Sequence, residues 1–330
     1  MTPMICNGSS ELKSTDDFIP VIDLSPARAG HFQDVGRKIH AAFTRSGFCY
    51  ITGHGIPEAV IDAARRTALD FFHLPLDEKL KSKPVESVRG FNALGRTKMK
   101  GALAPDHKEY FQIGLELARD DPAVLAGQPL RGPNQWPLSV PAFRPAFERY
   151  FDEVARCGRA LLRAVAVSIG ADEAFFVGKY DKPLQRTQAV YYPPHPQGVT
   201  TELFGVAPHT DYGCVTLLWQ DDVGGLEVMD RSGSWIAAPP IPGTLVINIG
   251  DLLHRWSNDR YFSNQHRVTN RSGRERLSIA TFFDPDFDAV VDPADLGLPV
   301  AEASRYPPVR AGDYIMGRIG ASQAHLKGAE

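Results

Sequence analysis

Residues 209–228 read HTDYGCVTLLWQDDVGGLEV and lie within a half-chain where short apolar runs alternate with turn residues. Runs of this kind, rich in β-branched and aromatic residues, predict strands. The predicted strands cover 186–192, 206–211, 214–219, 225–229, 244–249, 266–269 and 277–283. Because no helical pattern is apparent between them, they favour an antiparallel sandwich or barrel.

The first half of the chain has a different texture. Apolar residues at helical spacing predict helices over 32–46, from Pro57 onward, and over 141–169, where Gly170 ends the pattern. Short strands are expected over 18–24 and 48–52, a loop over 84–107, and a weak helix near 312–326. The fold class is therefore mainly β with flanking helices (α+β) and an N-terminal helical region.

Composition narrows the classes of function. The 330 residues carry 36 Lys and Arg against 39 Asp and Glu, a net charge of −3. A chain of this charge has no general attraction for nucleic acid or for an anionic membrane. We therefore expect neither partner, and no obligate protein partner. The N-terminus lacks the pattern of a secretory signal and the four cysteines are scattered, so we expect a cytoplasmic protein with reduced thiols.

The motif His209-Thr210-Asp211 carries the first sign of chemistry. Residues i and i+2 of a strand face the same side, so a strand-borne His-x-Asp aims an imidazole and a carboxylate into one space. These groups suit a divalent first-row metal, and one more imidazole would complete a two-His, one-carboxylate face. Most isolated His-x-Asp motifs are structural, so the motif needs further support.

That support comes from later strands. His266 begins one of them, and Arg276 and Ser278 share a face of the next. An Arg-x-Ser pair offers a guanidinium fork and a hydroxyl to a carboxylate, although Arg276 could instead form a surface ion pair with Glu275 or another nearby acid. Upstream, Tyr191 and Tyr192 end a strand before Pro193.

The order Tyr-Pro, His-Thr-Asp, distal His and Arg-x-Ser resembles the isopenicillin N synthase-like superfamily of iron(II)/2-oxoglutarate-dependent dioxygenases. The segments PPIPGTLVINIGDLLHRWSNDRYFSNQHRV (239–268) and RERLSIATFFDPD (274–286) continue the resemblance. In the first half it includes FIPVIDLS (18–25), SGFCYITGHGIP (46–57) and FFHLPLDEKLK (71–81). It covers about residues 18–320. The family carries the Gly-His-Gly around His54 as a structural turn.

The resemblance implies a distorted double-stranded β-helix, or jelly roll. It implies that His209, Asp211 and His266 bind Fe(II), and that Arg276 and Ser278 hold the distal carboxylate of 2-oxoglutarate. Tyr192 matches the tyrosine of the family's Tyr-Pro motif and is expected to contact the same cosubstrate or the substrate. With O2, such an enzyme oxidises an unactivated C–H bond of a small molecule by hydroxylation, desaturation or cyclisation, and forms succinate and CO2. The expected division is a tail over 1–17, an N-terminal dioxygenase region over 18–140, and a helix with the jelly-roll core and C-terminal helix over 141–330, all in one compact unit.

Candidate substrate contacts are the remaining expectation. Near relatives resembling the ethylene-forming enzyme carry different residues at several positions, and a basic loop over 95–101 would favour an anionic substrate. The candidates are Tyr191, Gln188, Trp219, Lys98 and Phe283. Two alternatives stay open: an oxidase of the isopenicillin N synthase type that needs no 2-oxo acid, and a non-catalytic protein of the same fold that binds a small acid.

Overall fold

A computed structural model describes residues 18–85, 88–98, 104–194, 203–296 and 303–322. Its strands form an eight-stranded major sheet, a four-stranded minor sheet and a two-stranded ribbon. The expected tail over 1–17 lies outside the described residues.

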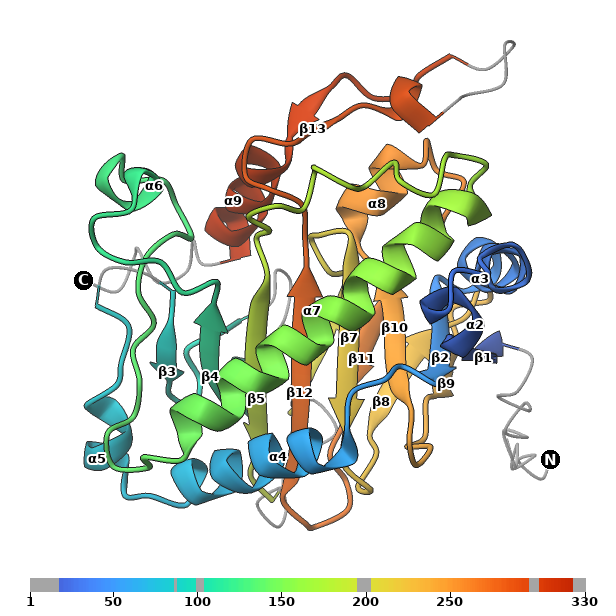
Figure 1. The fold of residues 1–330 in the computed structure, drawn as a ribbon. Helices are drawn as coiled ribbons and strands as arrows, with labels where there is room; N and C mark the ends of the chain where they lie inside the picture. The colour runs from blue at the N-terminus through green and yellow to red at the C-terminus, as the bar shows by residue number, and fades with distance from the viewer. Residues whose placement is uncertain (1–17, 86–87, 99–103, 195–202, 297–302, 323–330) are drawn as a thin grey trace, which may run out of the picture.

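The major sheet carries most of the β structure (Figure 1). In spatial order it consists of β1 (Val21–Asp23), β2 (Phe48–Thr52), β10 (Leu245–Ile249), β7 (Val215–Gln220), β12 (Arg276–Phe283), β5 (Arg186–Tyr192), β4 (Glu109–Gly114) and β3 (Gly90–Asn92). Only the β1–β2 pair among these is parallel. The minor sheet runs β6 (Val206–His209), β11 (His266–Val268), β8 (Leu226–Met229) and β9 (Trp235–Ala237), and the ribbon pairs β13 (Val290–Val291) with β14 (Val309–Arg310).

Helices cover one face of the major sheet, with the long α7 crossing it diagonally in Figure 1. The helices of the described residues are α2 (Ser25–Arg28), α3 (Gln33–Arg45), α4 (Glu58–Phe72), α5 (Leu76–Leu80), α6 (Pro122–Leu125), α7 (Phe143–Ser168), α8 (Asp251–Trp256), the 3-10 turn η1 (Pro293–Leu296) and α9 (Ala311–Ser322). Helix α7 packs against α3 and α4 as well as against the sheet. Its Gly158 faces Phe283, whose ring would lie 2.7 Å from a Cβ at that position. A glycine here lets the helix approach the sheet.

The two faces of the major sheet enclose different material. Side chains that point toward the helices, such as Leu277, Ile279 and Phe283 of β12, join the larger apolar core. Side chains that point the other way, such as Val190 and Tyr192 of β5, join a smaller core shared with the minor sheet. Because neighbouring residues of a strand alternate between faces, each strand contributes to both cores. This sandwich is the distorted double-stranded β-helix that the resemblance implies.

The strand predicted over 186–192 is confirmed as β5. The predicted bounds of the helices over 32–46 (α3) and 141–169 (α7), and of the other predicted strands of the second half, agree with the structure to within about two residues. The short strands expected over 18–24 and 48–52 correspond to β1 and β2, but it was not predicted that these strands, with β3 and β4, join the major sheet. Part of the predicted 84–107 loop is β3, and β4 was not predicted. The helix α8 also interrupts the run of strands, and α9 fills much of the predicted 312–326 segment.

Candidate active site

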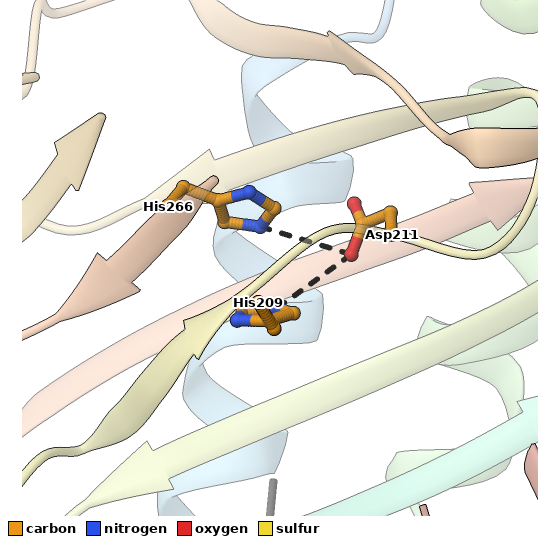
Figure 2. Close-up of side chains that lie close together, drawn as sticks. All are labelled: His209, Asp211 and His266. Atoms are coloured by element: carbon orange, nitrogen blue, oxygen red, sulfur yellow. Dashed lines mark ion pairs between the residues drawn. The ribbon is translucent and has the colours of Figure 1, made fainter. Parts of the chain in front are cut away.

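Three side chains from the minor sheet and the turn after it converge at the open end of the sandwich. His209 ends β6, His266 begins β11, and Asp211 lies two residues beyond the end of β6. Figure 2 shows both imidazoles turned toward the carboxylate. Oδ1 of Asp211 lies 3.7 Å from Nε2 of each histidine. The three ligand atoms all lie within 4.8 Å of one another, so they can bind one metal ion.

Backbone contacts orient the two imidazoles. Nδ1 of His209 lies 2.9 Å from the carbonyl of Ala207, and Nδ1 of His266 lies 3.2 Å from the carbonyl of Asn264. A carbonyl only accepts, so each Nδ1 carries the proton and each Nε2 presents a lone pair. This second contact is the usual companion of a metal-binding histidine. Strands β6 and β11 also pair His209 with His266 directly, which brings their rings to 4.2 Å between centroids.

The carboxylate of Asp211 is oriented in the same way. Its Oδ2 accepts hydrogen bonds from Oγ1 of Thr216 at 2.6 Å and from Nδ2 of Asn248 at 2.7 Å. Thr216 lies on β7 and Asn248 on β10, so the major sheet holds one oxygen while the other faces the two histidines. Neither residue was predicted from the sequence.

The protonation states suit a cation. Burial and the neighbouring His266 lower the pKa of His209 to about 3, so its imidazole is neutral at physiological pH. Burial tends to raise the pKa of Asp211. The two histidines and the hydrogen bonds from Thr216 and Asn248 lower it by more than burial raises it, so the carboxyl is ionised. Two imidazoles and one carboxylate are the donor set of the facial triad that binds non-haem Fe(II) with open positions.

The side chains of His209 and Asp211 point to the same place, but not because both lie on one strand, as predicted. The predicted strand over 206–211 ends at His209, so Asp211 is not a strand residue. Its main-chain carbonyl instead accepts a hydrogen bond from the amide of Asp251 at the start of α8, at 2.8 Å. The turn between β6 and β7 is anchored by this contact, which places the carboxylate beside His209 without strand alternation.

A buried guanidinium lies deeper in the sandwich. Arg276 is 1% exposed, and it stands beside Ser278 and Tyr192 on the face of the sheet that meets the minor sheet. Its Nε donates to the carbonyl of Gly224 at 2.6 Å and Nη1 donates to Oγ of Ser278 at 3.2 Å. The guanidinium carbon lies 4.7 Å from the centre of the Tyr192 ring. The structure therefore brings together the three residues that the resemblance assigned to the cosubstrate.

Arg276 has no ion-pair partner among the described residues. Glu275, the partner that a surface ion pair would need, instead contacts His73 and Tyr191 on the opposite face of the sheet. The charge of Arg276 acts on the nearby Asp221, but no carboxylate forms a direct ion pair with its guanidinium among the described residues, which makes an anionic ligand a fitting complement of this site.

Two adjoining cavities connect these features. The inner cavity lies between the two sheets, and its lining includes Arg276, Ser278 and Tyr192. The outer cavity opens on the other side of the metal ligands, and its lining includes residues of β4, β5 and α9. The residues common to both are Lys108, Gln188, His209, Asp211 and Phe282.

The predicted substrate contacts divide between the two faces of the major sheet. Gln188 lines both cavities. Tyr191, Trp219 and Phe283 face the helices and pack against the larger core, so they do not line either cavity. Tyr191 stacks on Phe72 of α4, which shows its direction plainly. Each of these three residues is one position out of phase with the cavity-facing residues of its strand, so the structure does not bring them to the cavities.

The basic loop is described only in part. Thr97 lines the outer cavity and Lys98 follows it. Lys98 is not among the lining residues, and 99–103 lie outside the described residues. Several residues that line this cavity were not predicted from the sequence, namely Lys108, Tyr110, Gln112, Arg186, Tyr212, Phe282 and Ile319.

Among the described residues, no helix is both long enough and apolar enough to span a bilayer.

Comparisons with known proteins agree with this site. The profile of the 2OG-Fe(II) oxygenase superfamily matches residues 183–285, which contain both histidines, Asp211 and Arg276. The profile described as non-haem dioxygenase in morphine synthesis N-terminal matches residues 19–139.

Curated relatives match over nearly the whole chain. A 2-oxoglutarate-Fe(II) type oxidoreductase of Emericella nidulans is 37% identical, over 90% of this chain and 88% of its own. A homoarginine-6-hydroxylase of Glycine max is 34% identical, over 91% of this chain and 96% of its own.

Solved structures share the fold as well. A 2OG-Fe(II) oxygenase family protein from Caulobacter crescentus superposes with a TM-score of 0.82 at 30% identity, covering 92% of this chain and 99% of that one. A full-length Neurospora crassa protein, crystallised in complex with alpha-KG and thymine, superposes with the same TM-score and identity, covering 93% of this chain and 98% of that one. With relatives this similar over most of their length, and with the metal-binding geometry intact, the chain belongs to the 2OG-Fe(II) oxygenase superfamily.

Proposed function

We propose that His209, Asp211 and His266 bind the Fe(II) of this oxygenase. The observation that carries the proposal is the position of Oδ1 of Asp211, 3.7 Å from both Nε2 atoms, while every other polar atom of the three side chains has a protein partner. Three donor atoms are thus left to one ion. A three-ligand face leaves open positions for the cosubstrate and for O2.

The second part of the proposal concerns 2-oxoglutarate. Arg276 and Ser278 hold its distal carboxylate, and Tyr192 forms one wall of that site. The buried guanidinium without an ion-pair partner supports this role, since it has donors left for a bidentate contact. Residues of the inner cavity exclude water around the cosubstrate.

Iron(II) and 2-oxoglutarate, when bound, supply the oxidation of a substrate C–H bond by O2, coupled to formation of succinate and CO2. The protein contributes geometry. The Nδ1 contacts fix both imidazoles, Asn248 and Thr216 fix the carboxylate, and Phe282 and Gln188 separate the inner cavity from the outer one. The substrate, a small molecule, lies in the outer cavity, where Gln188 contacts it; Lys98, beside Thr97, remains a predicted contact.

The test is iron content and turnover in matched variants. Protein reconstituted anaerobically with Fe(II) should hold one iron per chain, and His209→Ala, Asp211→Ala and His266→Ala should each lose most of it while keeping the thermal unfolding transition. His31→Ala, at an exposed position away from the site, serves as the control. If His209→Ala kept its iron and its turnover, the ligand assignment would be wrong.

A second measurement separates this function from an oxidase that uses no 2-oxo acid. Consumption of O2 should depend on 2-oxoglutarate and should be matched by succinate. Uptake of O2 that is the same with and without 2-oxoglutarate would contradict the proposal.

A further inference from the structure

The wall of the outer cavity contributed by β4 and β5 is unusually polar. Lys108 precedes β4, Gln112 lies on it, and Arg186 and Gln188 lie on β5. The register pairs Gln112 with Gln188 and Gly114 with Arg186, so the three side chains are neighbours on one face. The metal ligand Asp211 is the one carboxylate among the described residues that line this cavity.

Arg186 stands at the end of the sheet farthest from the cosubstrate site. The register pairs Phe282 with Arg186 and Arg276 with Tyr192. These two pairs are separated by about 20 Å along the strands, at about 3.3 Å per residue. The same face of β5 and β12 therefore carries a guanidinium near each end, and the metal ligands lie between.

The contacts of Arg186 leave it with donors to spare. Nη2 donates to Oδ2 of Asp284 at 3.0 Å, and the guanidinium carbon lies 4.9 Å from the ring centre of Phe282. Nε is buried and has no hydrogen-bond partner. Asp284 is itself fully buried behind the arginine, where it also accepts from the amide of Cys214. The acid fixes the arginine in place and does not line the cavity.

Lys108 repeats this arrangement nearer the metal. Its Nζ lies 3.2 Å from Oδ2 of Asp106, and Oδ1 of Asp106 accepts from the amide of Ala207. Burial tends to lower the pKa of Lys108. Asp106, with Tyr192 and Tyr110, raises it by more than burial lowers it, so the lysine is charged. An ammonium has three donors, and Asp106 occupies at most one of them.

A chain of hydrogen bonds through Gln112 and Gln188 fixes the orientation of the Gln188 amide in the cavity wall. Nε2 of Gln188 donates to Oε1 of Gln112 at 2.6 Å, and Nε2 of Gln112 donates to the carbonyl of Val88 at 3.0 Å. This chain leaves Oε1 of Gln188 without a donor from the described residues. The cavity thus offers two cationic donors and one amide acceptor.

We propose that the substrate is a small carboxylic acid, whose carboxylate is bound by Arg186 at the far end of the outer cavity and whose N–H or O–H group donates to Gln188, while Lys108, nearer the metal ligands, adds positive potential to the same cavity. The proposal rests on the proposed function and names the substrate class of the same site. Both cations are paired with acids behind them, so they are held in the cavity wall when no substrate is present. Bound carboxylate then receives charge-assisted hydrogen bonds in a site screened from water.

Binding of matched probes tests the proposal. Phenylacetate, phenylacetamide and 2-phenylethylamine differ in charge on one scaffold, and hexanoate, hexanamide and hexylamine repeat the series on an aliphatic chain. Calorimetry under argon, on protein loaded with Fe(II) and a small excess of 2-oxoglutarate, measures affinity without turnover. The carboxylate of at least one series should bind about 10- to 100-fold more tightly than its amide, and the amine most weakly.

Variants locate the preference. Arg186→Gln should reduce the advantage of the carboxylate about tenfold or more, and Lys108→Gln, which removes only a more distant charge, should reduce it less, while both leave affinity for the amide nearly unchanged. Arg186→Lys should restore part of it. Arg163→Gln is the matched control, because Arg163 pairs with Glu173 on the far side of the sheet.

The outcomes are distinct. Amides or amines that bind as tightly as the acids, acids that fail to bind in both series, or a preference that survives both variants would each overturn the carboxylate site. The same samples report binding of 2-oxoglutarate through its absorption with Fe(II). Loss of that signal in wild-type protein would instead contradict the proposed function, so the two failures can be told apart.

Discussion

Asn248 donates through Nδ2 to Oδ2 of Asp211 at 2.7 Å, which joins the major sheet to the metal-binding turn. Thr216 makes a parallel contact to the same oxygen at 2.6 Å. The carboxylate therefore cannot rotate freely, and Oδ1 stays directed at the two histidines. Because these two contacts hold the carboxylate in its binding orientation, little further ordering of Asp211 is needed when the metal binds.

Removal of either support should weaken the metal site without removing a ligand. Asn248→Ala or Thr216→Val should lower the affinity for Fe(II) about 10- to 100-fold, as measured by competition with a chelator. Thr187→Val is the control, since it removes a buried hydroxyl that bonds to Thr281 on the helix-facing side of the sheet. An unchanged iron affinity in both test variants would show that Asp211 needs no orientation.

Arg276→Gln should act on the cosubstrate alone. Loss of a buried charge contact costs about 2–4 kcal/mol, which corresponds to a rise of roughly 30- to 1000-fold in the KM for 2-oxoglutarate. Iron content should stay near normal. Arg267→Gln is the matched control, because Arg267 pairs with Glu227 and covers the ring of Trp235. A KM equal to that of the wild type would remove Arg276 from the cosubstrate site.

Phe282 and Phe283 should give opposite results although they are adjacent. Phe283→Ala removes a fully buried ring that packs on Gly158, so it should lower the free energy of unfolding by about 3–5 kcal/mol. The KM for 2-oxoglutarate should remain unchanged at temperatures where the variant is folded. Phe282→Ala should be less destabilising and should alter turnover. Urea denaturation and steady-state kinetics measure the two effects, and equal stability losses would contradict the assignment of faces.

His54 gives a prediction for the pH dependence of stability. Burial, and then the nearby Arg28, lower the pKa of His54 below its usual value of 6.5. As the pH falls below 6.5 the unfolded chain takes up a proton that the folded chain excludes, so stability should decrease with falling pH. His54→Asn keeps an acceptor for the amide of Ile56, which now bonds to Nδ1 of His54 at 3.1 Å.

The slope of unfolding free energy against pH should therefore be shallower in His54→Asn than in the wild type between about pH 7.5 and roughly pH 5.5, with metal removed. His31→Asn, at an exposed position, should keep the wild-type slope. Identical slopes in all three proteins would mean that His54 does not exclude the proton.

Strand alternation explains which site residues were predictable from the sequence. Arg276 and Ser278 define the cavity-facing parity of β12, and the same parity selects Phe282 rather than Phe283. On β5, Tyr192 and Gln188 select Arg186 and exclude Tyr191. Once one residue of each strand is assigned to the cavity, the alternation of the sequence predicts which of its neighbours also face the cavity.

Other features were not accessible in this way. Strand β4 is buried throughout, yet Glu109 and Gln112 interrupt its apolar pattern. Their partners, Lys79 and Gln188, lie far away in the chain, so only the tertiary structure shows that these polar groups are satisfied. Lys108 and its position beside the metal follow from β4 and were missed with it. The position of Asp211 likewise depends on α8, a helix that the sequence pattern did not indicate.

The alternation of β5 and β12 separates two properties that are often linked in enzymes. Residues 186, 188, 280 and 282 face the chamber where reactants meet, while 187, 189, 279 and 281 face the helices. Mutational libraries confined to the first set can explore new substrates with little effect on the helix-facing core, and stabilising substitutions can be sought in the second set without altering selectivity. A single pair of strands thus provides independent positions for specificity and for robustness.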